Sequence, residues 1–262
     1  MAGWAYAVEL PVPEKLERDF GVRRAAVTVV EPHESNADRQ VTVSYVGFTM
    51  ETLLTRWFGA DWQAPDAEVV FLARDGYRSA IASSRLKQFQ AYLAFGRDDG
   101  QAFVVDNPSQ NERRIPLGPY YLIWDNRAVP ELLRQGTHGW PYQVTRIELH
   151  STAGDRGLLP AHPSEEQQQG FKDAKEYCLT CHRIRGVGGD KNPADLVQSS
   201  CVWKDADLKT WIQDPNRLRP GTSMPPLDPM LPAEERQRIA ERIVAYLRSV
   251  NPSTCAGGAS RP

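Results

Sequence analysis

The chain has 262 residues, a formal net charge of −2 and a hydrophobic content of 41%. This length predicts two domains, and the apolar content is sufficient for each domain to bury a core. The nearly balanced charge excludes the strongly basic surface that is typical of nucleic-acid-binding proteins. Because the sequence contains no run of about 18 apolar residues, we also expect no membrane-spanning segment.

Residues 1–150 have the mixed pattern of strands and helices of an α+β domain. Runs of β-branched residues with partial alternation predict strands, and apolar residues on one face predict a short amphipathic helix. The expected strands cover residues 25–30, 40–45, 68–73, 101–106, 120–124 and 144–149, and the expected helices cover residues 49–58 and 84–91. Helices do not separate every pair of strands, which indicates the α+β class.

Three sequence segments of this domain resemble the molybdopterin-binding oxidoreductase domain of the sulfite oxidase family. These segments are Val69–Tyr77, Leu117–Trp124 and Trp140–Leu149. The resemblance covers about residues 25–150 and implies that these segments mark core strands and the turns that join them. That family holds molybdenum through a cysteine thiolate, but this chain has no cysteine before Cys178. We therefore expect the fold without the metal chemistry, and we do not expect bound molybdopterin.

Arginine and histidine side chains are the remaining polar candidates of the first domain. A guanidinium fork suits phosphate, so four arginines are candidates for an anion clamp, with solvated surface charges as the plainer interpretation. The histidines lack metal-ligand spacing, so we expect them to be structural or exposed. The arginines are Arg74, Arg78, Arg113 and Arg114, and the histidines are His33, His138, His150 and His162.

Residues 151–163 contain glycine, proline and small residues that break any periodicity, so we expect a linker there. A second domain then covers residues 164–255, and residues 256–262 form a tail. Ser164 and Gln167 have the spacing of a capping box, which predicts the start of a helix.

The second domain contains the sequence Cys178-Leu179-Thr180-Cys181-His182. C-x-x-C-H is the attachment site of a c-type haem, whose vinyl groups form thioethers with the two cysteines. The histidine that follows can then reach the iron. A lone C-x-x-C also fits a redox dithiol or half of a zinc site, but the adjoining histidine argues against both. We therefore predict one covalent haem c, with His182 as an axial ligand of the iron.

A haem iron needs a second axial ligand or an open position. No histidine follows His182, whereas two methionines, Met224 and Met230, do. Met224 lies in a loop that prolines stiffen, and a rigid loop can present a thioether sulfur at low entropic cost. We therefore expect Met224 as the sixth ligand, with Met230 or an open position as the alternatives.

Residues from about 164 to 250 resemble a class I cytochrome c domain. The resemblance rests on the C-x-x-C-H motif, on the glycine-rich segment Gly186–Pro193 and on three expected helices. These helices end at about residue 177, cover residues 205–213, and run from 233 to about 250. The resemblance implies an all-α fold in which the first and last helices cross beside the haem. Phe171 and Tyr246 are the candidates for this contact.

Three further residues are candidates for the surroundings of the haem. By the same resemblance, the carbonyl of Pro193 accepts the Nδ1 proton of His182, which orients the ring. Trp203 and Trp211 either line the haem pocket or pack in the ordinary core.

The resemblance also implies a docking surface, because this family presents an exposed haem edge to its partners. Three cations flank this edge: Arg183, Arg185 and Lys191. They either steer an acidic partner or form a generic solvated face.

Cysteine usage indicates the compartment. By family resemblance, bacterial c-type haem attachment takes place outside the cytoplasmic membrane, so we expect a periplasmic or otherwise extracytoplasmic protein. The first nine residues carry no visible export signal, and we infer that a signal peptide has been removed or replaced. In an oxidising space Cys201 and Cys255 can pair. An intermolecular bridge through Cys255 and two unpaired thiols are the alternatives.

These features together predict an electron-transfer protein rather than an enzyme. A haem with both axial positions filled carries single electrons between redox partners such as a dehydrogenase, an oxidase or another cytochrome. The first domain then serves for docking or as a scaffold. Two alternatives stay open: a haem enzyme or small-gas binder with a labile sixth ligand, and a molybdenum oxidoreductase fused to its cytochrome acceptor.

Overall fold

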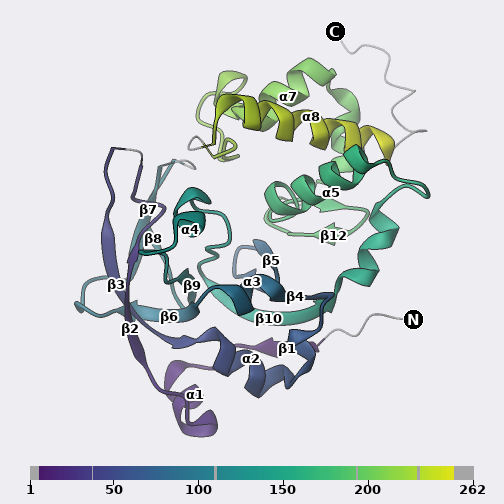
Figure 1. The fold of residues 1–262 in the computed structure, drawn as a ribbon. Helices are drawn as coiled ribbons and strands as arrows, with labels where there is room; N and C mark the ends of the chain where they lie inside the picture. Colours follow the sequence, from purple (N-terminus) through teal and green to yellow (C-terminus); the bar gives the residue numbers. More distant parts are fainter. Residues whose placement is uncertain (1–5, 37, 109–110, 193, 229–230, 251–262) are drawn as a thin grey trace. The chain divides into compact units, whose positions relative to one another are not determined.

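The computed structural model describes residues 6–36, 38–108, 111–192, 194–228 and 231–250 (Figure 1). The chain divides into two compact units. The N-terminal unit comprises the residues up to 108 and residues 112–154, and the C-terminal unit comprises residues 109–111 and the chain from 155 onward.

Two four-stranded antiparallel sheets and one hairpin build the N-terminal unit. The first sheet has the order β2 (Ala25–Val30), β3 (Thr42–Thr49), β6 (Ala91–Arg97) and β9 (Tyr121–Trp124). The second has the order β1 (Tyr6–Glu9), β10 (Val144–Ser151), β4 (Ala67–Ala73) and β5 (Arg78–Ala82). The hairpin joins β7 (Val104–Asn107) and β8 (Glu112–Pro116), and the helices are α1 (Pro13–Phe20), α2 (Met50–Phe58), α3 (Ser83–Gln88) and α4 (Pro130–Arg134).

The strands that the sequence does not predict are β1, β5, β6 and β8. Strand β6 is hydrogen-bonded on both sides, to β3 and to β9, and its residues Ala91, Leu93 and Ala94 are buried. Its sequence is a mostly apolar run without alternation of apolar and polar residues, so its periodicity does not identify it. A turn at Asp75 and Gly76 joins β4 to β5.

A hydrogen-bonded polar cluster lies inside this unit, around the carboxylate of Glu31. Glu31 has no exposed surface, and it accepts hydrogen bonds from Tyr45 (2.7 Å), from Tyr121 (3.0 Å) and from Nδ1 of His33 (2.8 Å). A buried carboxylate is tolerated only when such donors replace water. Burial alone raises the pKa of Glu31, but His33 and the Tyr45 hydroxyl outweigh burial and hold this pKa below its usual range.

The lowered pKa of Glu31 predicts a loss of stability in acid. A carboxyl with a lowered folded-state pKa contributes stability that is present above its unfolded pKa of about 4.3 and is lost as the pH falls through the folded value. Glu31→Gln should remove this pH dependence. It should also lower the free energy of unfolding at neutral pH by about 2 kcal/mol, because the amide group of glutamine places a donor where the tyrosine hydroxyls need an acceptor. Hydrogen exchange of the β2 and β3 amides measures both effects. Unchanged protection relative to the exposed-site control Glu51→Gln would contradict this account.

The C-terminal unit is mostly helical. The helices are α5 (Glu165–Tyr177), α6 (Leu196–Ser199), α7 (Asp205–Gln213) and α8 (Ala233–Ser249), with a short hairpin of β11 (Arg183–Ile184) and β12 (Val187–Gly188). The capping box expected at the start of α5 is confirmed, since Gln167 N–H donates to Ser164 Oγ and Ser164 N–H donates to Gln167 Oε1. An all-α fold does not predict the hairpin, whose strands of two residues are too short to leave a sequence pattern.

The segment expected as a linker is ordered. Strand β10 continues to Ser151, and a 3₁₀ helix covers Thr152–Leu158. Leu158 is buried in the hydrophobic core of the C-terminal unit. Its carbonyl also accepts a hydrogen bond from the Tyr246 hydroxyl at 2.8 Å, so the end of this segment belongs to the packed structure of that unit.

Helices α5 and α8 pack closely because Gly170 lies between them. A Cβ atom at Gly170 would overlap the carbonyl oxygen of Arg242 on α8. The expected contact of Phe171 with Tyr246 is present, with ring centroids 5.5 Å apart. Nε of Arg242 also lies 2.6 Å from the carboxylate of the buried Asp173. Glycine, aromatic packing and an ion pair therefore fix this crossing together.

Gly170→Ala should force the two helices apart. Alanine favours an isolated helix over glycine by about 1 kcal/mol, but overpacking against backbone costs about 1–3 kcal/mol or more, so the net effect is destabilising. Urea unfolding followed by circular dichroism measures the change. Gly157→Ala is the control, because a Cβ there meets no atom within 4 Å. Equal midpoints for the two variants would contradict the close approach.

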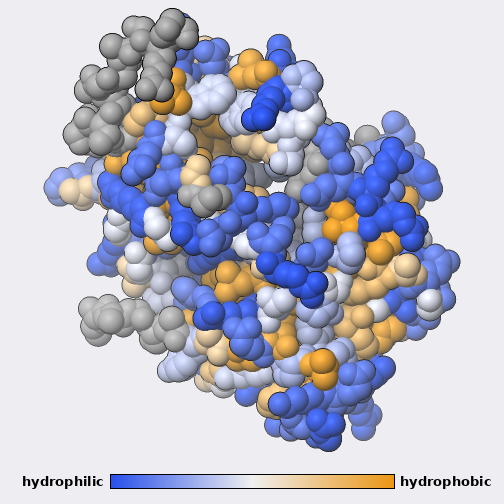
Figure 2. Space-filling model, turned by 180° about the vertical axis from the view of Figure 1, so that it is seen from behind, coloured by the Kyte–Doolittle hydropathy of each residue, from blue (hydrophilic) through white to orange (hydrophobic). Residues whose placement is uncertain are grey.

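The face shown in Figure 2 is largely hydrophilic, with smaller hydrophobic areas between the polar side chains. Within the described ranges, no helix combines the length and the apolar character that crossing a bilayer requires.

Candidate functional site

The C-x-x-C-H motif forms a tight turn directly after α5. Cys178 caps the helix, and both Cys178 N–H and Leu179 N–H donate to the carbonyl of Ala174 at 2.9 Å. Cys181 N–H and His182 N–H then donate to the carbonyl of Cys178 at 3.1 and 2.9 Å. Because the two cysteines are three residues apart in a helical turn, they lie on the same side of it. The turn thus brings together the three residues that the sequence singles out.

The residues between the two cysteines anchor the motif in the core. Leu179 and Thr180 are buried, whereas Cys178 and Cys181 are half-buried. The two cysteines are thiols and are not joined by a disulfide. Burial raises the pKa of the Cys178 thiol to about 12, and Cys181 and Asp173 add to the effect. The motif therefore offers two thiol groups on one side of a rigid turn, and burial favours the protonated form of Cys178.

His182 is held beside the two cysteines with one ring nitrogen enclosed. In the part of the chain that the structure describes, its buried Nδ1 has no hydrogen-bond partner. Burial lowers the pKa of His182, and the backbone of Ala194 opposes this effect without cancelling it. The ring is thus favoured in the neutral form that ligates metals. Pro193, the expected acceptor of the Nδ1 proton, lies outside the described residues.

The glycine-rich segment packs directly onto the backbone of the motif. A Cβ atom at Gly188 would overlap the carbonyl oxygen of His182, and a Cβ atom at Gly189 would overlap that of Thr180. Gly189 N–H donates to the carbonyl of Leu179 at 2.8 Å, and Asn192 N–H donates to that of Cys181 at the same distance. Only glycine permits this approach, so the segment acts as a backbone support for the motif.

Two of the expected docking cations have structural partners. Arg185 donates to the carbonyl of Gly157 at 2.9 Å and to that of Val250 at 2.8 Å. It therefore joins the chain before α5 and the chain after α8 to the loop that follows the motif. Its side chain stays exposed, and its expected role as a steering cation stays a prediction. Arg183 pairs with Asp190 at 2.9 Å, and Lys191 is half-buried.

The loop that carries Met224 is closed by its own hydrogen bonds. Gly221 has a φ of 76°, and its N–H donates to the side chain of Asn216. Met224 N–H donates to the Thr222 hydroxyl at 3.2 Å, and Leu227 N–H returns the loop to the end of α7 by donating to the carbonyl of Gln213. Met224 itself is half-buried. Its pairing with His182 stays a prediction, and the alternative, Met230, lies outside the described residues.

Trp203 and Trp211 lie together. Their rings are stacked, with centroids 5.4 Å apart and planes inclined by 28°. Arg248 on α8 fixes the backbone beside them, because it donates to the carbonyls of Ser200 and Trp203. Both tryptophans are half-buried, which fits a pocket lining as well as the edge of the core.

Cys201 is disulfide-bonded. Its expected partner, Cys255, lies outside the described residues, so the identity of the pairing stays a prediction.

The arginine and histidine candidates lie on several different elements. Arg74 and Arg78 belong to the β4–β5 hairpin, and Arg113 and Arg114 are exposed on β8. Of the histidines, His33 is buried against Glu31, His150 contacts Glu148 at 2.6 Å, His162 is exposed and His138 is half-buried. Among the described residues, no three His, Cys, Asp or Glu side chains gather into a metal cluster.

Sequence reasoning missed the structural role of Arg185 and the cluster around Glu31. Neither has a local signal, because the contacts of Arg185 span 28 and 65 residues and the Glu31–Tyr121 bond spans 90.

No protein-family model matches the chain. Over 80 residues the chain is 32% identical to cytochrome c oxidase subunit 2 of Alkalihalophilus pseudofirmus, an alignment that covers 28% of this chain and 22% of that relative. The chain thus spans about a fifth of the length of the curated relative that it matches.

Arg185→Ala should destabilise the C-terminal unit by about 2 kcal/mol, because it removes two charged hydrogen bonds, one to the carbonyl of the buried Val250 and one to that of the exposed Gly157. Arg183→Ala, which removes one surface ion pair, should cost less than about 1 kcal/mol. Thermolysin cleavage near the end of α8 reports this difference, since cleavage tracks the population of the opened form. Equal cleavage rates for the two variants would show that Arg185 does not hold the end of α8.

Proposed function

We propose that this protein is an extracytoplasmic c-type cytochrome that carries single electrons between redox proteins. One haem c would be attached to Cys178 and Cys181, with His182 and Met224 as the axial ligands. The observation that supports this most strongly is the helical turn that holds two thiols and a neutral imidazole together. The partial similarity to an oxidase subunit, over 80 residues, also supports the proposal.

The residues of the motif fit a covalent haem. Two thiols on one side of a turn suit two thioether bonds, and the following imidazole is in the form that ligates iron. The buried and unpartnered Nδ1 of His182 leaves a donor for a neighbouring carbonyl. A C-x-x-C zinc half-site or a redox dithiol would need neither this histidine nor the glycine support beneath it.

Each part of the C-terminal unit has a task in this proposal. The glycine segment keeps the turn in place, and the closed loop after α7 keeps Met224 in a defined position. Trp203 and Trp211 exclude water from one side of the site. When bound, haem c supplies a single one-electron centre, and a methionine ligand raises its reduction potential relative to two histidines.

The wider architecture is part of the proposal. The C-terminal unit is assigned to the class I cytochrome c domains, and the N-terminal unit to the molybdopterin-binding fold of the sulfite oxidase family. The absence of any cysteine before Cys178 supports an N-terminal unit that works without molybdenum, as a docking module or scaffold. The attachment of haem c implies a periplasmic or otherwise extracytoplasmic location.

Replacing Met224 tests the axial ligation. The oxidised protein should show the weak red absorption of a thioether–ferric bond, and Met224→Ala should abolish it and open the ferrous iron to carbon monoxide. Met230→Ala is the matched control and should leave both properties unchanged. Loss of the band in the Met230 variant would show that Met230, and not Met224, is the sixth ligand. Rapid carbon monoxide binding by the unaltered protein would contradict the electron-transfer function and favour a small-gas binder or a haem enzyme.

A further inference from the structure

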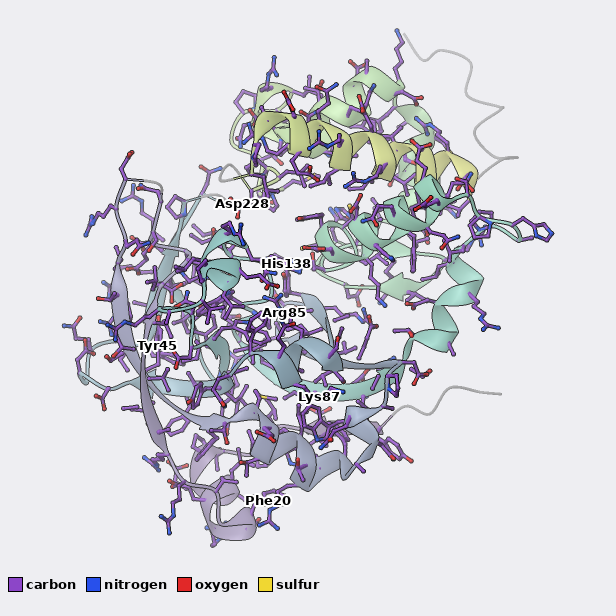
Figure 3. All side chains as sticks on the ribbon, viewed as in Figure 1. Phe20, Tyr45, Arg85, Lys87, His138 and Asp228 are labelled. Atoms are coloured by element: carbon purple, nitrogen blue, oxygen red, sulfur yellow. The ribbon has the colours of Figure 1, made fainter. Side chains whose placement is uncertain are left out.

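The cluster around Glu31 contains two tyrosines whose hydroxyls meet a buried base. Tyr45 on β3 is 1% exposed, and its hydroxyl donates to Oε2 of Glu31 at 2.7 Å. Tyr121 on β9 is fully buried and donates to the other carboxylate oxygen, Oε1, at 3.0 Å. Figure 3 shows Tyr45 among densely packed side chains of the N-terminal unit.

This arrangement meets the main chemical requirement for oxidising a buried phenol. A phenol that loses an electron becomes strongly acidic, so oxidation is easiest where a base can take the proton at once. Burial and the adjacent Glu31 carboxylate raise the pKa of Tyr45 well above its usual value, and the phenolate is therefore not available beforehand. The electron and the proton must leave together, and Oε2 of Glu31 is positioned to receive the proton.

A row of aromatic rings connects this pair to a less buried side chain. The Tyr45 and Tyr121 ring centroids are 5.6 Å apart, and those of Tyr121 and Tyr142 are 6.5 Å apart. Tyr142 is half-buried, and the Trp140 ring lies 5.9 Å from that of Tyr121. Rings at such separations exchange electrons readily, so an oxidising equivalent that arrives at Tyr142 can reach Tyr45 without the oxidant entering the core.

Among the residues that the structure describes, the other buried tyrosines donate to backbone carbonyls and not to a carboxylate. The Tyr120 hydroxyl donates to the backbone carbonyl of Pro11, and the Tyr246 hydroxyl donates to that of Leu158. A peptide carbonyl is too weak a base to keep the proton of an oxidised phenol. A tyrosyl radical would therefore be most stable at the tyrosine pair beside Glu31.

We propose that Tyr45 is a one-electron redox site of the N-terminal unit, with Glu31 as its proton acceptor and small radical oxidants as its substrate class. In the step, one electron passes from Tyr45 to the radical, which becomes an anion. The proton passes from Tyr45 Oη to Glu31 Oε2, which leaves a neutral phenoxyl radical beside a neutral carboxylic acid. This site is independent of the proposed haem and gives the N-terminal unit a function of its own.

Pulse radiolysis of the full chain in its oxidised form, with azide radicals as the one-electron oxidant, tests the proposal. The expected product is a long-lived phenoxyl radical, detected by its optical band and by electron paramagnetic resonance after freeze-quenching. Tyr45→Phe should lose most of this signal. Tyr120→Phe, the matched control with a hydroxyl on a carbonyl, should keep it. Equal long-lived yields in the two variants would overturn the proposal.

Two further measurements keep the test valid if a variant folds poorly. The unaltered protein should form the radical more slowly in heavy water, because a proton moves in the same step, and equal rates in the two solvents would overturn the proposal. Glu31→Gln retains Tyr45 but removes the base, and it should lower the long-lived yield as Tyr45→Phe does. Circular dichroism of each variant confirms that the fold is retained.

Discussion

The hydrogen-bonded turn at the end of α5 is the feature on which the C-terminal unit depends. It continues the helix just far enough to set Cys178, Cys181 and His182 on one short, rigid segment. The backbone of Gly188 and Gly189 lies against this turn so closely that neither position admits a side chain. A reactive group attached here would therefore be held by backbone geometry, which is stiffer than side-chain packing alone.

The rest of the unit stabilises this turn through long-range contacts. Gly170 permits α8 to approach α5, and the pair of Asp173 and Arg242 spans the same crossing. Arg185 then joins the loop after the motif to Gly157, near the start of the unit's sequence, and to Val250, which follows its last helix. Local geometry and global stability are thus coupled, since loosening either end of the unit also loosens the support of the motif.

How much could be predicted depended on the range of the interactions. The capping box at Ser164 and the helical periodicity of α8 are local signals, and the sequence predicts both elements to within a few residues. Strand β6 was missed because its residues, Ala91–Arg97, form a mostly apolar run without alternation. The partners of Arg185 and Glu31 lie tens of residues away, so no short pattern reveals them. The same limit applies to Met224, whose pairing with His182 is a question of three-dimensional placement.

The two units differ in how they use buried polar groups, with a motif near the surface in one and an enclosed carboxylate in the other. The central claim concerns the first: Cys178 and Cys181 hold an iron porphyrin by covalent bonds. Its most direct test is to denature the purified protein in acid and extract it with an organic solvent. The account predicts that the pigment stays with the polypeptide. Pigment that passes into the solvent, or a polypeptide that carries none, would contradict it.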